Sequence, residues 1–185
     1  GFQGDDLSRP GAIAACAKHF LGYGASEGGR DYGYVGIPEI DLRNVYMPPF
    51  KAAVDAGVAT FMTAFSDVNG VPASGNRFLM RTVLRDEWKF PGFVVSDWES
   101  IIDMIVHGFA ANEMEAAFEA LSAGVDMEMA STTYRDHLAE LLAAKRIDQD
   151  TLDTAVRNVL RVKFQLGLFE RTVTDPSRYP AVASA

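Results

Sequence analysis

The sequence predicts an α/β fold, specifically a partial (β/α)8 TIM-like barrel. Short apolar runs alternate about four times with segments of helical spacing, which is the pattern of a parallel sheet with crossover helices. Polar or glycine-rich loops follow several of these runs, so chemistry-bearing residues gather at one edge of the predicted sheet. A complete eight-unit barrel typically needs around 250 residues. The chain has 185 residues, so we expect about half of a barrel.

The composition fits a globular chain with a sizeable core, because 48% of the residues are hydrophobic. The formal net charge is −8 and the acidic residues are spread along the chain, which argues against nucleic acid and membrane as partners. No run approaches the roughly twenty apolar residues of a membrane span. We expect a soluble, excised part of a longer protein, because the N-terminus is acidic and lacks Met. The sequence does not distinguish a periplasmic, a secreted and a cytoplasmic parent. The one cysteine, Cys16, lies in an apolar run and is expected to be buried.

The first predicted unit starts with an apolar run at residues 13–17, a strand whose functional end carries Lys18 and His19. Glycine is too frequent in residues 21–33 for a helix or a central strand, so this stretch is predicted to be a shaped loop. Residues 41–56 have helical spacing, and a proline pair inside them should kink or split the helix.

The second and third units are compact. Residues 59–65 are a strand candidate, residues 66–72 a turn-rich loop and residues 76–88 an amphipathic helix. The next strand, at residues 93–97, follows a Pro-Gly turn signal. Residues 101–106 are predicted to be helical, with the helix starting near the two residues before them.

The last unit comprises a helix at residues 112–123, a strand at residues 125–129 and two further helices at residues 133–144 and 148–166. A glycine ends the first of these helices. An aspartate is placed to cap the start of the last helix, and Gly167 is placed to stop it.

Asp97 ends the third predicted strand and is followed by Trp98. In a parallel α/β architecture this strand edge is where ligands bind, and a partly hydrated carboxylate there has a pKa that neighbours can tune. An indole offers a flat apolar face that suits the C–H face of a sugar ring as well as a protein core. The local pattern leaves one alternative open, in which Asp97 caps the following helix and Trp98 packs under a loop.

Together these motifs resemble glycoside hydrolase family 3, and the β-glucosidase type in particular. The matching stretches are residues 18–20, 27–32, 65–72, 85–90, 94–98, 124–127 and 162–169. They cover nearly the whole chain in the family's order. The resemblance places the chain in roughly the second half of the family's N-terminal domain. Residues 1–170 are therefore predicted to be the C-terminal part of the catalytic barrel, and residues 171–185 the start of an interdomain linker.

The resemblance implies exo-acting, retaining hydrolysis of terminal non-reducing β-D-glucosyl residues, with Asp97 as the nucleophile that forms a covalent glycosyl–enzyme. A Lys-His pair suits the donation of hydrogen bonds to sugar hydroxyls. An alternative role for Arg30 is an ion pair with Asp31 that braces the glycine-rich loop. The expected substrate-binding residues are Lys18, His19, Trp98, Arg30 and Phe65.

In the branch of this family that removes N-acetylglucosamine, the loop after the first strand carries a catalytic Asp-His pair. Here Tyr23 stands where that His is usual, which favours the β-glucosidase branch, whose acid/base is a Glu from a following domain. Ser66 also stands where Asn is common. The expected partners are a β-glucoside or cello-oligosaccharide and the remaining segments of the parent enzyme, including its C-terminal α/β domain.

No cofactor is expected. A metal site built from His19, Asp97 and Glu99 is set aside, because their spacing matches no zinc or calcium pattern. Three alternatives stay open: a β-xylosidase of the same family, an inactive carbohydrate-binding or structural barrel module, and a lyase that uses Lys18 as a Schiff base.

Overall fold

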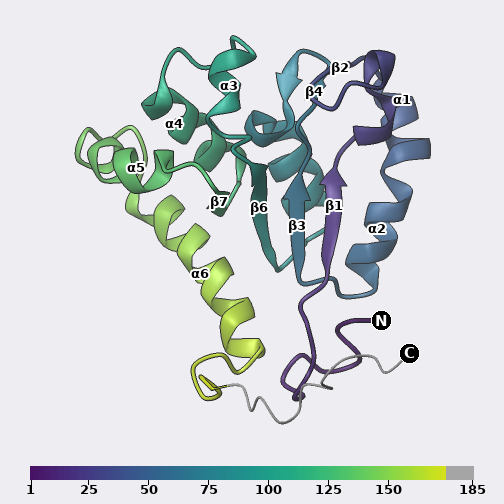
Figure 1. Cartoon of the computed structure of the whole chain (residues 1–185), viewed down its shortest axis with the longest axis vertical. Coiled ribbons are helices and arrows are strands. Elements are labelled where there is room, and N and C mark those ends of the chain that lie inside the picture. The colour runs from purple at the N-terminus through teal and green to yellow at the C-terminus, as the bar shows by residue number, and fades with distance from the viewer. Residues whose placement is uncertain (174–185) are drawn as a thin grey trace, which may run out of the picture.

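The computed structural model describes residues 1–173. Its central sheet has four parallel strands, each followed by helices (Figure 1). Because sequential strands are neighbours and all run the same way, the sheet is a stretch of a (β/α) barrel, as the sequence predicts. Of the predicted linker, residues 171–185, the part from residue 174 onward lies outside the described residues. In the order β1-β3-β6-β7, the strands are β1 (Cys16–Phe20), β3 (Thr60–Thr63), β6 (Phe93–Trp98) and β7 (Met127–Met129).

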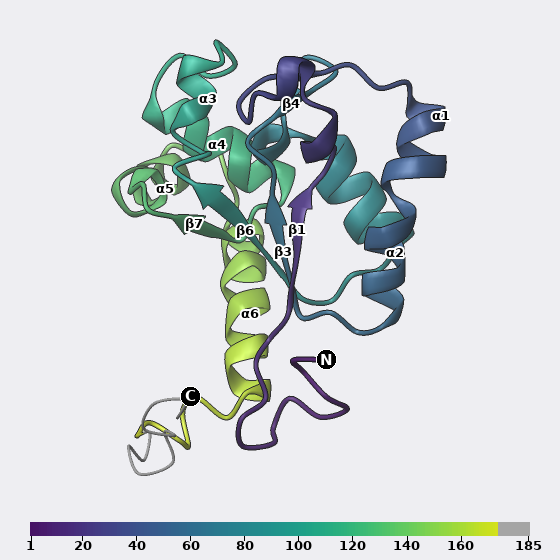
Figure 2. The same cartoon turned by 45° about the vertical axis from the view of Figure 1, so that its right-hand side comes forward.

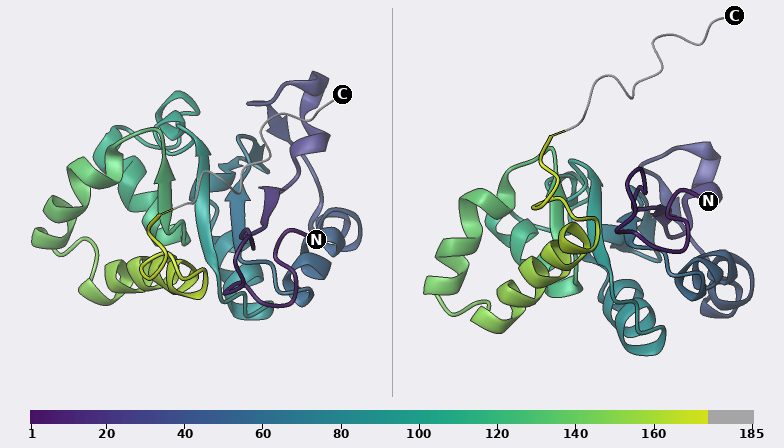
Figure 3. Two further views of the ribbon diagram at one scale, coloured as in Figure 1. Left: turned by 60° about the horizontal axis from the view of Figure 1, so that its bottom comes forward. Right: turned by 90° about the horizontal axis from the view of Figure 1, so that it is seen from below.

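The helices form an arc along one side of the sheet, which is seen end-on from below in Figure 3. Helix α2 covers the β1 end of the sheet and α6 packs behind β6. The helical segments are α1 (Glu39–Asp41), η3 (Leu42–Tyr46), α2 (Pro48–Asp55), η5 (Phe78–Glu87), α3 (Asp103–Val106), α4 (Glu113–Ala123), α5 (Thr133–Ala143) and α6 (Gln149–Gln165).

Most helix boundaries lie at the predicted positions, because the residues at each boundary set them. The proline pair splits the first predicted helical region, residues 41–56, and α2 begins at Pro48, where a missing N–H costs nothing. The Asp148 carboxylate caps α6 by accepting the Thr151 N–H at 2.7 Å. Gly124 ends α4 with a φ of 112°, a conformation that glycine adopts readily. The helix predicted at residues 101–106 is shorter, because the chain makes a tight turn before α3.

A second, three-stranded sheet lies beyond the carboxyl ends of β1 and β3 (Figure 2). It was not predicted, because two-residue strands carry no periodic signal. Asn69 supports it by bonding both the N–H and the C=O of Ile37, at 2.9 and 2.7 Å. This small sheet ties the glycine-rich loop to the loop that follows β3. Its strands are β2 (Tyr34–Val35), β4 (Asp67–Val68) and β5 (Val71–Pro72), in the order β2-β4-β5.

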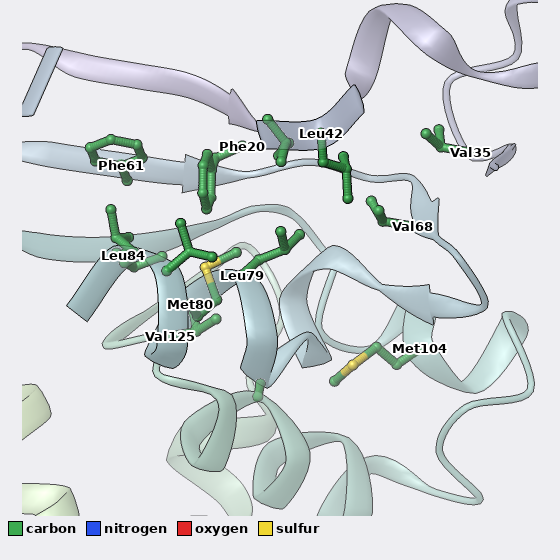
Figure 4. Packing of buried hydrophobic residues seen from close by; sticks show 14 of the residues in the cluster. Phe20, Val35, Leu42, Phe61, Val68, Leu79, Met80, Leu84, Met104 and Val125 are labelled. Carbon is green, nitrogen blue, oxygen red and sulfur yellow. The ribbon is translucent and has the colours of Figure 1, made fainter. Parts of the chain in front are cut away.

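The core lies between the sheet and the helical arc, where Phe20 and Phe61 are fully buried with their rings 5.3 Å apart, edge to face (Figure 4). At the start of β6 the chain packs so closely that a Cβ on Gly92 would lie 2.0 Å from the Ala59 carbonyl oxygen, so only glycine fits. Cys16 corrects an expectation: it is exposed, because β1 is an edge strand of the described sheet.

A buried ion pair fixes the opposite end of the sheet. Arg85 donates to Asp126 at 2.5 Å and to the carbonyls of Phe90 and Gly92 at 2.9 and 2.7 Å. Asp126 also accepts the Val94 N–H at 2.8 Å. These bonds join η5, β6 and the start of β7, far from the edge that carries Asp97.

Candidate active site

Asp97 and His19 meet at the carboxyl edge of the sheet. Asp97 is the penultimate residue of β6 and His19 the penultimate residue of β1. The Nε2 atom of His19 lies 3.5 Å from Oδ2 of Asp97, and their side chains are 24% and 10% exposed. The sheet therefore brings together two of the residues that the sequence predicts as a site.

The Asp97 carboxylate is more enclosed than a partly hydrated strand-end acid, since the residue is only 7% exposed. Its Oδ1 accepts the Trp98 N–H at 2.7 Å, whereas Oδ2 is buried and has no hydrogen-bond partner among the described residues. Asp97 does not cap a helix, because α3 begins only at Asp103 and has no side-chain cap. A buried carboxylate oxygen without a donor is unfavourable, so Oδ2 is an unsatisfied acceptor of this site.

His19 is held against the glycine-rich loop. Its ring stacks on Tyr23 with centroids 4.6 Å apart, and the peptide bond before it is cis. The loop itself is pinned by Ser66, which is fully buried, lies 3.1 Å from the Ser26 hydroxyl and donates to the Asp31 carbonyl at 3.2 Å. Ser66 thus has a defined role in shaping the loop beside the site.

A hollow of about 350 Å³ opens beside Asp97. Trp98 is 61% exposed and forms one wall. Asp97 is not part of the lining, but the two residues after it are. A hollow of this size with aromatic walls and a few polar groups is typical of a small-molecule site. Its lining residues are Tyr32, Trp98, Glu99, Asp103, Val106 and His107.

The hollow is acidic. Burial raises the pKa of Asp103, with Glu99 adding to the rise and His107 opposing it. Loss of hydration and nearby carboxylates, Asp103 foremost, raise the pKa of the Tyr32 phenol, and Asp97 contributes to this shift. The two carboxyl groups of the lining, Glu99 and Asp103, therefore disfavour anionic ligands.

The remaining predicted substrate-binding residues, Lys18, Arg30 and Phe65, do not line the hollow. Lys18 is exposed and forms no ion pair within residues 1–173. Arg30 is exposed on the glycine-rich loop, and no ion pair with Asp31 forms in the described part of the chain. The half-buried ring of Phe65 packs on Tyr32, with centroids 4.6 Å apart, and so supports a wall of the hollow.

Of the residues that line the hollow, sequence reasoning placed only Trp98 in the site; it did not find Tyr32, Glu99, Asp103, Val106 and His107. One signal was available: Glu99, Asp103 and His107 are spaced by four, which puts them on one face of a helical turn. Tyr32 carries no such signal, because a loop brings it to the site.

Within residues 1–173, no group of three or more His, Cys, Asp or Glu side chains is arranged to hold a metal ion. No helix of this range is long and apolar enough to cross a membrane.

An enclosed carboxylate at the carboxyl edge of a parallel (β/α) sheet, beside a hollow with aromatic walls, places the chain among the (β/α) barrel proteins that carry a ligand site at this edge. Within that class the family is shown by the signature described as Glycosyl hydrolase family 3 N terminal domain, which matches residues 1–162. The chain belongs to glycosyl hydrolase family 3.

Individual relatives agree with this assignment. The chain is 43% identical to a periplasmic beta-glucosidase of Salmonella typhimurium over 90% of its own length and 22% of the relative. It is 38% identical to a beta-xylosidase of Formosa agariphila over 85% of the chain and 23% of the relative. A beta-glucosidase from Listeria innocua, solved in complex with glucose, superposes with a TM-score of 0.89 at 42% identity, covering 91% of this chain and 24% of that one. The chain thus spans about a quarter of the length of these relatives.

Proposed function

We propose that this chain carries the nucleophile and part of the glucose-binding subsite of an exo-acting, retaining β-glucosidase. The observation that carries the proposal is the Asp97 carboxylate, whose unpartnered Oδ2 lies at the strand edge 3.5 Å from the imidazole of His19. The binding of glucose by the Listeria innocua beta-glucosidase supports the choice of sugar.

In the proposed reaction, Asp97 attacks the anomeric carbon while an acid protonates the leaving oxygen, which gives a covalent glycosyl ester. Water, deprotonated by the same acid/base, then attacks the anomeric carbon and releases Asp97, so the β configuration is retained. Retention requires a second carboxyl group roughly 5–5.5 Å from the first. We expect this acid/base to be a Glu outside these 185 residues.

The remaining residues bind and orient the sugar. His19 and Lys18 donate hydrogen bonds to its hydroxyls. Trp98 stacks on a C–H face of a ring in the hollow, and Tyr32, supported by Phe65, forms another part of the wall. The acidic lining excludes anionic glycosides. The expected substrates are β-glucosides and cello-oligosaccharides.

Trapping tests the assignment of the nucleophile. A 2-deoxy-2-fluoro β-glucoside with a good leaving group slows breakdown of the glycosyl–enzyme, so the complete protein should accumulate one label. Peptide mass spectrometry should locate that label on Asp97. A label on Glu99 or Asp67 would overturn the assignment. A complete protein that binds glucose but neither labels nor turns over would instead be a carbohydrate-binding module.

A second specificity within the same chemistry is favoured by the 38% identity to a beta-xylosidase. A xyloside lacks the C6 hydroxymethyl group and presents less surface to the aromatic walls. The ratio of kcat/KM for aryl β-glucoside and aryl β-xyloside decides between them. A ratio above one supports the β-glucosidase proposal, and a ratio below one supports the xylosidase.

A further inference from the structure

A cluster of three buried hydroxyl groups lies behind Asp97. It consists of Thr63 at the end of β3, Ser74 in the short turn η4 (Ala73–Gly75) and Ser100 just after β6. These residues are 0%, 1% and 5% exposed. Their oxygens lie 2.8 Å apart for Thr63 and Ser74, 2.7 Å for Ser74 and Ser100, and 3.4 Å for Thr63 and Ser100. We call Thr63, Ser74 and Ser100 the hydroxyl cluster.

The hydroxyl cluster ends on the backbone of Asp97. The Asp97 N–H donates to Oγ1 of Thr63 at 3.2 Å. A hydroxyl can donate one hydrogen bond and accept two, so Thr63 can accept the Asp97 amide and still bond to a neighbouring serine. Removing the Thr63 oxygen would leave the Asp97 N–H buried without an acceptor, which buried backbone groups rarely tolerate.

The carbonyl of Asp97 is held in the same way. Ser96, fully buried, donates its hydroxyl to the Asp97 carbonyl at 2.9 Å and accepts the Met129 N–H at 2.8 Å. The Ser100 N–H donates to the same carbonyl at 3.2 Å. Both backbone groups of Asp97 therefore bond to residues other than its regular strand partners.

The sheet does not fix Asp97 by itself. The regular pairing of β3 with β6 ends at Met62 and Val95. On the other side, the pairing of β6 with β7 slips in register between Val95 and Trp98. Asp97 lies beyond the first ladder and inside the slip of the second. Beyond the regular ladder, the hydroxyls of Thr63 and Ser96 bond the backbone N–H and C=O of Asp97.

We propose that Thr63 is a positioning residue: through the hydroxyl cluster it sets the direction in which the Asp97 carboxylate faces the anomeric carbon. This inference rests on the proposed nucleophilic role of Asp97. Nucleophilic attack requires aligned atoms about 3–3.5 Å apart, and a shift of about 1 Å costs on the order of 100-fold in rate. A buried, fully connected hydroxyl cluster provides this alignment better than a surface loop does.

The test compares three variants of the complete enzyme. Thr63→Val keeps the shape and removes the acceptor, whereas Thr63→Ser keeps the hydroxyl. Thr60→Val is the matched control, because Thr60 lies on the same strand, is 5% exposed and donates its hydroxyl to the Ala15 carbonyl at 3.0 Å, at the far end from Asp97. We measure kcat on an aryl β-glucoside, the Kd of isofagomine, the rate of trapping by a 2-fluoro glucoside, and Tm.

Thr63→Val should lower kcat and the trapping rate roughly 10–100-fold, with the Kd of isofagomine changed by less than a few-fold. Thr63→Ser should restore most of the rate. Thr60→Val should lower Tm by a comparable amount and leave kcat unchanged. If Thr63→Val fails to fold, Ser74→Ala, which removes the next hydroxyl, should show a smaller fall in kcat with unchanged Kd.

Equal effects of Thr63→Val and Thr60→Val on kcat would overturn the inference, as would a Thr63→Val enzyme that traps at the wild-type rate. Either result leaves the proposed function intact if the wild type labels at Asp97. A wild type that labels at another residue overturns the proposed function and this inference together.

Discussion

His19 Nε2 and Asp97 Oδ2 lie 3.5 Å apart and so connect β1 to β6 across the strand between them. The distance is too long for a good hydrogen bond, and Oδ2 has no other partner among the described residues. Because the two atoms are this far apart, neither His19 Nε2 nor Asp97 Oδ2 uses its hydrogen-bonding capacity on the other. In the proposed site, both atoms can therefore form a hydrogen bond with a bound sugar.

The first prediction concerns the charge of Asp97. Asp97→Asn in the complete protein should lower kcat on an aryl β-glucoside by on the order of 10³-fold or more, because an amide is not a nucleophile. The same change should raise Tm by a few degrees, since it replaces Oδ2, a buried carboxylate oxygen that lacks a donor among the described residues. Steady-state kinetics and calorimetry check both effects.

The matched control is Asp86→Asn, which removes an exposed carboxylate from η5 and should change neither kcat nor Tm. Asp97→Gly supplies a second check: azide should restore turnover and yield the α-glucosyl azide, the inverted product of direct attack. A β-configured product would contradict the nucleophilic role.

The second prediction concerns His19. Replacing it by Ala removes a hydrogen-bond donor to the sugar, and leaving a buried partner unsatisfied costs about 1–3 kcal/mol. We therefore expect kcat/KM to fall roughly 10–100-fold. Tyr23→Phe keeps the ring that stacks on His19 and should retain nearly full activity. A His19→Ala enzyme with wild-type kcat/KM would remove His19 from the site.

The third prediction separates the two tryptophans. Trp98 is 61% exposed, so Trp98→Ala should change stability by less than about 0.5 kcal/mol. It should raise KM for an aryl β-glucoside roughly tenfold, because about 1 kcal/mol or more of ring stacking is lost. Trp88 packs against the core, with its ring 5.9 Å from Phe20, so Trp88→Phe should lower Tm and leave KM unchanged. A reversed pattern would place sugar binding elsewhere.

The strands that carry the site were predictable because their signals are local. The apolar run ending at Asp97 is bounded by a Pro-Gly turn, and it forms β6 where predicted. The capping aspartate of α6 and the split before α2 have equally local causes.

The surroundings of Asp97 were not predictable, because they depend on contacts between distant segments. Tyr32 reaches the hollow from a loop, and Thr63 reaches the Asp97 amide from another strand, 34 positions earlier in the chain. The near-complete burial of Asp97 has the same origin. Such features require the pairing of β3 with β6, which no window of neighbouring residues contains.

The fourth prediction is a pH dependence of stability that arises at Asp148. Hydrogen bonds from Thr151 lower the pKa of this capping carboxylate below its ordinary value of 3.8. A lowered folded pKa means that the stabilisation is present above about pH 3.8 and is lost as the pH falls through the folded value. Asp148→Asn keeps the cap and removes the titration.

The measurement is Tm against pH for wild type and Asp148→Asn. The wild type should be the more stable at neutral pH, because a charged cap also interacts with the helix dipole. The difference in Tm should shrink as the pH falls below about 3.8. A difference that stays constant with pH would show that the carboxylate charge contributes nothing to the cap.

The fifth prediction uses the ion pair at the other end of the sheet. Asp126→Ala leaves the Arg85 guanidinium, whose side chain is 17% exposed, without its carboxylate, and leaves the Val94 N–H without its acceptor. Breaking a buried pair on one side costs about 3–5 kcal/mol. Urea unfolding should show this loss as a lower midpoint. The control, Asp136→Ala, breaks an exposed pair with Arg135 and should leave the midpoint nearly unchanged.

Activity measured well below the unfolding midpoint distinguishes this effect from catalysis. Asp126 bonds the N–H of Val94 at the start of β6, whereas Asp97 lies near the end of that strand. The folded fraction of Asp126→Ala should therefore keep the wild-type kcat and KM, even though the protein unfolds at lower urea. A fall in kcat at full folding would mean that strain at the start of β6 reaches its functional end. In that case the hydroxyl cluster would not be sufficient to hold Asp97 in place.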